Sequence, residues 1–230
     1  MSMNYLAHYV IDCIPNAPCY NAGLLLPDLL RPALDGMRIE KLIRRHPSSL
    51  ASSLLGFHQG IEQHVERDRR FHNSRLFHEE SRAIRHILSE EAALSHKRYL
   101  FFLAHIWLEL GIDRWIITYQ PHYAEALYQD WARISYFSWG RLLAYHQLHA
   151  HGERIAQRLR RFYEHAFLWK YRDSGQLQGI LQRVAQHVGL SYFEDMESER
   201  FEAINARIDA RIDQRLSLDS HKTLNRGVLQ

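Results

Sequence analysis

A histidine, an aspartate and a second histidine follow one another at intervals of four residues, as His64, Asp68 and His72. Residues four apart lie on one face of a helix, with about 5–6 Å between their Cβ atoms, so these side chains form a stripe. An imidazole and a carboxylate one turn apart can bind a single metal ion from a rigid scaffold. Alternatively, Asp68 pairs with a nearby arginine on a solvated face. The spacing is compatible with both interpretations.

A second stripe with the same spacing lies in the most apolar part of the chain. It consists of His105, Glu109 and Asp113, within the run from Tyr99 to Tyr119. Burying an unpaired charge is costly, so these groups must pair with each other, with an arginine or with a metal ion. Mixed nitrogen and oxygen ligands from two facing helices would suit Mn, Fe or Zn. The two stripes are therefore the first candidates for a metal site.

The overall composition indicates a folded globular protein. Of the 230 residues, 46% are hydrophobic and 24% are charged, which excludes a disordered or low-complexity chain. The two cysteines, Cys13 and Cys19, are too few for a disulfide framework or a four-cysteine zinc site. The 16 histidines are unusually many. We interpret most of those outside the stripes, such as His58 and His146, as surface or satisfied core residues.

The charge pattern favours an acidic partner over nucleic acid. The formal net charge of +3 is a mild basic bias, which attracts acidic partners at long range. The basic residues Arg158, Arg160 and Arg161 precede Phe162 and Tyr163. Some nucleic-acid-binding proteins interleave basic and aromatic residues in this way, but so does any amphipathic surface helix. We expect such a surface helix and no nucleic-acid partner.

No segment predicts targeting to a membrane or insertion into one. Met1–Pro15 has no Lys or Arg, and His8 and Asp12 interrupt its apolar stretch, unlike a signal peptide. The apolar run 99–119 carries charged side chains near its centre, which are costly in a bilayer. We therefore expect a cytoplasmic enzyme or binding protein with no membrane partner. The sequence leaves the oligomeric state open.

Apolar residues recur with the period of a helix almost throughout, and strand-like alternation is absent. Ser48 or Ser49, Asn73 or Ser74, and Ser95 are the expected N-caps of three helices. The expected helical segments span residues 24–34, 48–68, 74–88, 95–115, 123–149, 154–172, 176–188 and 198–216. The last of these should be partly exposed along a stripe formed by Ile204, Ile208 and Ile212. The pattern predicts an all-α fold with one helical domain over 1–216 and a polar tail over 217–230.

Three short segments in the first third of the chain resemble one enzyme family. Met3–His8, with the sequence MNYLAH, is similar to the MN(F/Y)LAH opening of the bacterial acyl carrier protein phosphodiesterases. Gly23–Leu29, GLLLPDL, resembles the family's GNLLADF segment. Gly60–Asp68, GIEQHVERD, resembles its GIxxHRxID segment.

Two later segments match the same family in the same order. Leu108–Trp115 lies where the family has a DHxLxxxW helix, with Trp115 as the matching tryptophan. Tyr171–Asp173 resembles the RYRD element that precedes the family's last helices. Each motif is short, so the resemblance depends on their ordered series, which extends over roughly residues 3 to 190.

The resemblance implies an all-helical fold distantly related to the HD-type metal phosphohydrolases. It also implies that the 4′-phosphopantetheine arm is removed from holo acyl carrier protein, an acidic partner. The cofactor would be a divalent metal ion, with Mn²⁺ as the first candidate and Fe, Zn or Mg as alternatives. By position, His8, Asp28, His64 and Asp68 match polar residues of the family's motifs and are the expected metal ligands.

Further residues are expected to complete such a site. His105 is a fifth candidate metal ligand. The candidate catalytic acid–base groups are Asp68, His72 and Glu109. Arg67, Lys170 or Arg172 would hold the phosphate charge, and of these Arg172 lies in a matched motif. A metal ion held by imidazole and carboxylate groups lowers the pKa of bound water and polarises a phosphoryl oxygen.

The chain departs from the family's motifs at Leu24, Val65, His72 and Leu108. These residues stand where the family has Asn, Arg, a second acid and the Asp of an Asp-His pair. Substituted ligands, such as His72 for an aspartate, would preserve a metal site. The alternative is a non-catalytic or altered-substrate helical protein that retains the fold and a carrier-protein or metal-binding surface.

Overall fold

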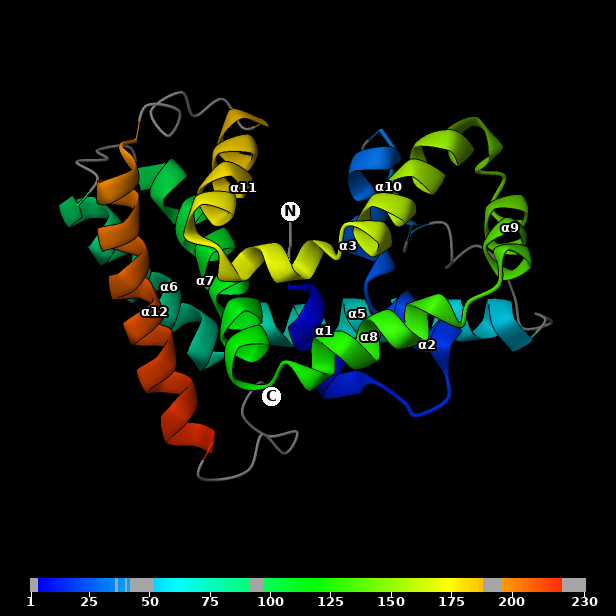
Figure 1. Cartoon of the computed structure of the whole chain (residues 1–230), viewed down its shortest axis with the longest axis horizontal. Helices are drawn as coiled ribbons and strands as arrows, with labels where there is room; N and C mark the ends of the chain where they lie inside the picture. Colours follow the sequence, from blue (N-terminus) through cyan, green and yellow to red (C-terminus); the bar gives the residue numbers. More distant parts are fainter. Residues whose placement is uncertain are drawn as a thin grey trace. The chain divides into compact units, whose positions relative to one another are not determined.

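The computed structural model describes residues 4–35, 37–39, 41, 52–91, 97–187 and 196–220. Every regular element in these ranges is a helix, and none of the residues described forms a strand (Figure 1). The all-α class predicted from the sequence is therefore confirmed. Within the same ranges, no helix combines the length and the apolar character that a bilayer-spanning segment requires.

The chain divides into two compact units. The first unit comprises Met3–Arg69 and Gln120–Leu168, and the second comprises Arg70–Tyr119 and Trp169–Gln230. Each unit is thus built mainly from two separate stretches of chain. The single domain expected over residues 1–216 stays a prediction.

The first unit contains mostly short helices. Its elements are α1 (Tyr5–Asp12), α2 (Pro18–Gly23), α3 (Leu26–Leu30), the 3₁₀ turn η1 (Arg31–Ala33), most of α5 (Ser52–His72), α8 (His122–Ala132), α9 (Tyr136–Tyr145), the 3₁₀ turn η2 (His149–His151) and α10 (Gly152–Glu164). The ring of Trp131 lies 5.2 Å from that of Trp139 and 4.9 Å from that of Phe162, between centroids. These aromatic contacts join α8, α9 and α10.

The second unit is built from longer helices. Its elements are the end of α5, α6 (Arg75–Glu91), α7 (Lys97–Tyr119), the end of the 3₁₀ helix η3 (Phe167–Arg172), α11 (Ser174–His187) and α12 (Ser198–Ser220). The isoleucines of α12, Ile204, Ile208 and Ile212, are all buried. The expectation of an exposed isoleucine stripe is therefore wrong, because α12 packs against α6 and α7 of the same chain.

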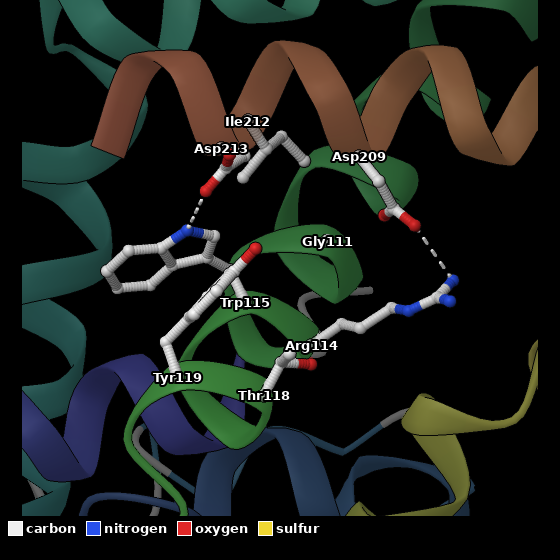
Figure 2. A pocket seen from close by; sticks show the side chains of 8 residues that line it. All are labelled: Gly111, Arg114, Trp115, Thr118, Tyr119, Asp209, Ile212 and Asp213. Atoms are coloured by element: carbon white, nitrogen blue, oxygen red, sulfur yellow. Dashed lines mark hydrogen bonds and ion pairs between the residues drawn. The ribbon is translucent and has the colours of Figure 1, made fainter. Parts of the chain in front are cut away.

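A small pocket lies between α7 and α12 (Figure 2). The indole N–H of Trp115 donates to Asp213 at 3.0 Å, and Arg114 forms an ion pair with Asp209 at 3.1 Å. The volume of the pocket is about 150 Å³. Sites for small molecules start at about 300 Å³. The pocket is lined by none of the residues predicted to do chemistry, and we assign these polar contacts to helix packing.

Two of the predicted helices are interrupted in the structure. The segment 123–149 forms α8 and α9, and the Ser135 side chain caps α9 by accepting a hydrogen bond from the Ser138 amide. The segment 154–172 breaks after Glu164, since Ala166 adopts a φ of 42°, in the left-handed region that ends a helix. Neither break is marked by a proline or glycine, so apolar periodicity alone did not reveal them.

The expected helix caps were correct where the structure describes them. The Ser74 hydroxyl accepts a hydrogen bond from the Phe77 amide at 3.1 Å, which caps α6 as predicted. Ser48, Ser49 and Ser95 lie outside the described residues.

A pair of glycines lets α2 and α5 pack backbone against backbone. A Cβ atom at Gly23 would lie 2.5 Å from the Phe57 carbonyl oxygen and 2.9 Å from the Cα of Gly60. A Cβ atom at Gly60 would overlap the Tyr20 carbonyl oxygen. Because only glycine lacks a Cβ atom, only glycine permits this approach. The end of α2 is thereby brought against α5 one turn before His64.

Candidate metal centre

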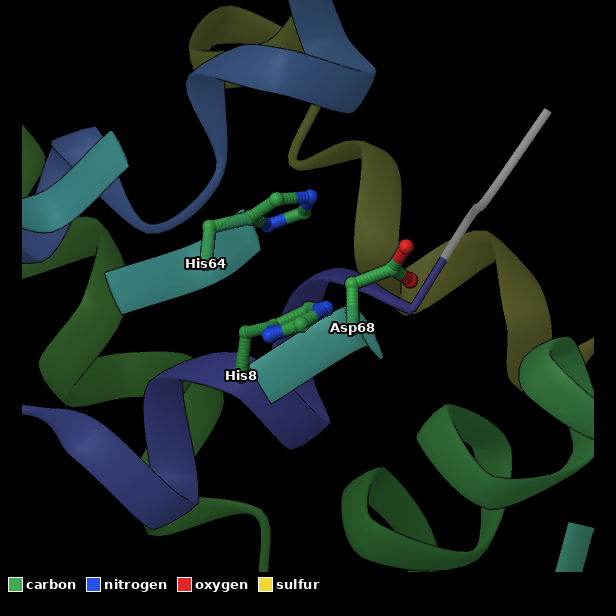
Figure 3. A group of neighbouring side chains, drawn as sticks. All are labelled: His8, His64 and Asp68. Atoms are coloured by element: carbon green, nitrogen blue, oxygen red, sulfur yellow. The ribbon is translucent and has the colours of Figure 1, made fainter. Parts of the chain in front are cut away.

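Three of the predicted metal ligands meet in the first unit (Figure 3). His8 comes from α1, and His64 and Asp68 come from consecutive turns of α5. One ligand atom of each side chain lies within 4.8 Å of those of the other two. We call these three residues the first cluster.

A fourth predicted ligand, Asp28 of α3, faces the first cluster. Its Oδ1 atom lies 4.0 Å from Nε2 of His64. His8, His64 and Asp28 are buried, whereas Asp68 is half-buried. The rings of His8 and His64 pack on each other, with centroids 4.1 Å apart and planes tilted by 31°. The structure thus groups three of the four residues that the resemblance implied and places the fourth, Asp28, beside His64.

A main-chain carbonyl orients the His64 ring. Nδ1 of His64 lies 2.7 Å from the carbonyl oxygen of Leu24, which can only accept, so Nδ1 carries the proton. In the neutral ring, Nε2 then carries the lone pair, and Nε2 is the atom that faces Asp28. Metal-binding histidines commonly donate their second N–H to a carbonyl in this way. Leu24 is the C-cap of α2, where the last carbonyls lack partners within the helix.

The distances suit a divalent ion. At 4.0 Å, His64 Nε2 and Asp28 Oδ1 are too far apart for a hydrogen bond. Nitrogen and oxygen ligands bind Zn²⁺ at about 2.0–2.2 Å, so two ligands of one ion lie about 3–4 Å apart. Small side-chain movements would therefore close the first cluster on an ion. Two imidazoles and two carboxylates form a mixed donor set that suits Mn, Fe or Zn.

A hydrogen-bond network fixes α1, which carries His8. The Tyr9 hydroxyl donates to Asp130 Oδ2 at 2.9 Å, and the Asn21 amide donates to the same oxygen at 2.6 Å. Burial and the adjacent Asp130 carboxylate raise the pKa of the Tyr9 phenol, so it remains a donor. Sequence reasoning missed this network, because Asn21 and Asp130 are 109 positions apart and neither belongs to a motif.

Arg67 joins α5 to the end of α1. It donates to the Asp12 carboxylate from Nε at 3.0 Å and from Nη2 at 2.7 Å. The Gln63 side chain donates to Asp12 as well, at 2.8 Å. Because two of its nitrogen atoms bind Asp12, Arg67 serves to position the two helices and is a poor candidate for holding phosphate.

The remaining predicted histidines gather in the second unit. His72, the last residue of α5, lies with His105 and Glu109 of α7, and one ligand atom of each is within 4.8 Å of the others. We call these three residues the second cluster. Each sequence stripe is thus divided in the structure. His72 is grouped with residues of the other stripe and not with His64 and Asp68. His105, expected beside the ligands of the first cluster, is grouped with His72 and Glu109 instead.

Two further residues of the sequence analysis lie outside both clusters. Asp113, the last member of the second stripe, is fully buried on α7. Arg172 is exposed at the end of η3, with its guanidinium carbon 6.0 Å from the centre of the Trp169 ring. The phosphate-binding role expected of Arg172 stays a prediction.

The histidine pair in the first unit is part of the core. His58 and His146 are buried, and their Nε2 atoms lie 2.8 Å apart in a hydrogen bond. Of the two interpretations, surface or core, both residues therefore belong to the core.

Compared with known proteins, the chain matches no family model, no curated protein and no solved structure.

Proposed function

We propose that this protein is a metal-dependent phosphodiester hydrolase whose divalent ion is bound by His8, His64, Asp68 and Asp28. The observation that carries the proposal is the fixed orientation of His64. Its hydrogen bond to the Leu24 carbonyl directs Nε2 toward Asp28. A ligand held in its binding orientation gives a more exact site than one that must be ordered on binding.

The donor set supports this chemistry. Two carboxylates supply the negative charge that a divalent cation requires, and two imidazoles favour Mn, Fe or Zn over Mg. A bound ion of this class would polarise a phosphoryl oxygen and lower the pKa of a water molecule. We propose Mn²⁺ as the ion, in line with the family that the motifs resemble.

The side chains have separate roles in the proposed hydrolysis. The water oxygen forms a bond to phosphorus, and the bond between phosphorus and the alcohol oxygen breaks. The alcohol oxygen gains a proton as it leaves. His8, His64, Asp28 and one carboxylate oxygen of Asp68 hold the ion, and the first three side chains are buried. Asp68 is half-buried and within reach of solvent, so we assign its carboxylate the proton that the attacking water loses.

For the substrate we propose holo acyl carrier protein, from whose serine the 4′-phosphopantetheine arm is released. The proposal is supported by the ordered motifs, which include all four residues proposed as ligands. The net charge of +3 agrees with an acidic partner. A distant relation to the HD-type phosphohydrolases belongs to the same proposal.

The test is intact-mass spectrometry of holo acyl carrier protein incubated with this protein and Mn²⁺. Wild type should remove the mass of the arm, whereas His64→Ala and Asp68→Asn should not. His165→Ala is the matched control, because His165 is an exposed histidine of the same unit. Circular dichroism of each variant checks that the helices are retained.

Each outcome has a distinct meaning. Removal of the arm by all variants alike would overturn the assignment of the site. Hydrolysis of a small phosphodiester, bis(4-nitrophenyl) phosphate, without action on the carrier would retain the chemistry and reject the proposed substrate. Inactivity of wild type on both would favour the alternative of a non-catalytic helical protein.

A further inference from the structure

We propose that His72, His105 and Glu109 form a second metal site, separate from the first cluster, which takes a Zn²⁺-like cation. This inference does not depend on the proposed hydrolysis. It is based on three side chains within one unit, brought together from two helices.

The geometry directs two imidazole nitrogens at one carboxylate oxygen. Oε1 of Glu109 lies 2.8 Å from Nε2 of His105 and 3.5 Å from Nε2 of His72. Two ligands of a tetrahedral Zn²⁺ ion, bound at about 2.0–2.2 Å, lie about 3.4 Å apart. The contact between Glu109 and His105 would have to open by only about half an ångström to admit an ion.

Charge also favours a cation at this position. The Glu109 side chain is fully buried, and a buried carboxylate requires a compensating positive charge. Neutral imidazoles that carry their proton on Nδ1 present the Nε2 lone pair, and both Nε2 atoms lie beside the same Glu109 oxygen. A divalent cation at this point would bind all three side chains and pair with the carboxylate while both imidazoles stay neutral.

Two phenylalanine rings pack against the imidazoles of the second cluster. The ring of Phe77 contacts His72 and His105 edge to face, with centroids 4.6 Å and 5.2 Å away. Phe71 contacts the His72 ring in the same manner at 5.5 Å. The side chains of His72 and His105 nevertheless remain 24% and 19% exposed. Solvent, and hence a hydrated cation, can reach the imidazoles while the carboxylate stays dry.

The ligand types indicate the class of metal. Two histidines and one glutamate are a set that binds Zn²⁺ with a fourth position for water. This set has one carboxylate, whereas the first cluster together with Asp28 has two. The second cluster is therefore the softer ligand set and is less suited to Mn²⁺ or Mg²⁺. Because His72 ends α5 and the other two residues belong to α7, the ion would fasten these helices together within the second unit.

An exposed pair on α6 offers a matched control. His86 Nε2 lies 3.1 Å from Glu90 Oε1, the same contact at the same spacing as His105 and Glu109. Among the described residues, no group of three possible metal ligands includes this pair. The side chains of His86 and Glu90 are 72% and 46% exposed. Adventitious Zn²⁺ binding to a surface His–Glu pair would therefore be detected here.

The test counts Zn²⁺ on the full-length protein, first stripped with EDTA, by native mass spectrometry and calorimetric titration. His105→Ala and His72→Ala should each lose one equivalent of Zn²⁺ relative to wild type. Loss of a residue that only supports a ligand already weakens metal binding by about 10- to 100-fold, so loss of a direct ligand should weaken it at least about 100-fold. His86→Ala should bind as wild type does. His64→Ala should retain the equivalent that His105→Ala loses, which separates this proposal from that for the first cluster.

Three results would overturn the proposal. One is an unchanged Zn²⁺ count in both His72→Ala and His105→Ala. Another is loss of Zn²⁺ only together with loss of helical circular dichroism in both variants, which would indicate unfolding. Glu109→Gln keeps the side-chain shape and removes the charge, so Zn²⁺ retained at full affinity by that variant would also exclude the site.

Discussion

The two clusters contain the same kinds of side chain, two imidazoles and a carboxylate, with opposite burial. In the first cluster His8 and His64 are buried and Asp68 is half-buried. In the second, Glu109 is fully buried and both imidazoles are partly exposed. The same kinds of side chain therefore lie in different environments, because the helices cover a different member of each set.

The difference in burial indicates a difference in chemistry. The first cluster lies beside a second carboxylate, Asp28, and has an imidazole oriented by the Leu24 carbonyl, a set that would suit a harder ion. The second has one dry carboxylate whose charge must be compensated, so it favours tight binding of a borderline cation. We interpret the first as a site for reaction and the second as a site that stabilises its unit.

The largest effect is expected at the glycine contact that supports the first cluster. Gly60→Ala places a Cβ atom on the Tyr20 carbonyl oxygen, so α2 and α5 must separate. Overpacking costs about 1–3 kcal/mol, and we expect the upper end because the obstacle is backbone. Chemical denaturation measures the loss, and Mn²⁺ binding should weaken with it as Leu24 moves away from His64.

Gly140→Ala is the control for this variant. Gly140 lies within α9, and a Cβ atom there would meet open space, so alanine should stabilise the helix by up to about 1 kcal/mol. Equal effects of the two substitutions would mean that the close packing of α2 on α5 does not support the site.

The next effect tests whether the clusters bind different ions. A ligand at 100 times its Kd adds about 2.7 kcal/mol to the stability of the state that binds it. Thermal melting of His64→Ala should lose the response to Mn²⁺ and keep the response to Zn²⁺. His105→Ala should keep the response to Mn²⁺ and show a smaller response to Zn²⁺, and EDTA should abolish both responses in wild type. A single ion that serves both clusters would make the two variants behave alike.

A smaller effect is expected at the network that fixes α1. Tyr9→Phe removes one hydrogen bond to Asp130, which still accepts from Asn21. Hydrogen bonds to charged groups contribute about 1.5–3 kcal/mol, and we expect the lower end because one donor remains. Urea denaturation measures the change. Zn²⁺ binding, assigned to the second unit, should be unaffected, and a parallel loss of Zn²⁺ would contradict the separation of the clusters.

The smallest effect is expected at an exposed ion pair of the first unit. The hydrogen bonds from Arg154 lower the pKa of Asp35 from its ordinary value of about 3.9. A lowered pKa contributes stability above the unfolded value, and this contribution is lost as the pH falls through the folded value. In Asp35→Asn the melting temperature should depend slightly less on pH between about pH 4 and pH 2. Added salt should reduce this difference between the variant and wild type. An NMR titration that gives Asp35 its ordinary pKa would refute the prediction.

Periodicity predicted the helices well and their interruptions poorly. The run that contains His105 and Glu109 is one helix, as expected, because its apolar residues are continuous. The breaks near Ser135 and Ala166 were missed, since they depend on local backbone conformations that no glycine or proline announces.

Spacing along the chain is enough to predict which side chains share a helix face, because residues four apart lie about one helical turn apart. It therefore identified His64 with Asp68, and His105 with Glu109. The resemblance to a known family added His8 to the first pair, whereas the grouping of His72 with the second pair is seen only in the folded chain. Which helix faces which depends on packing between distant segments, such as the glycine contact of α2 with α5, and periodicity within one helix carries no information about that contact.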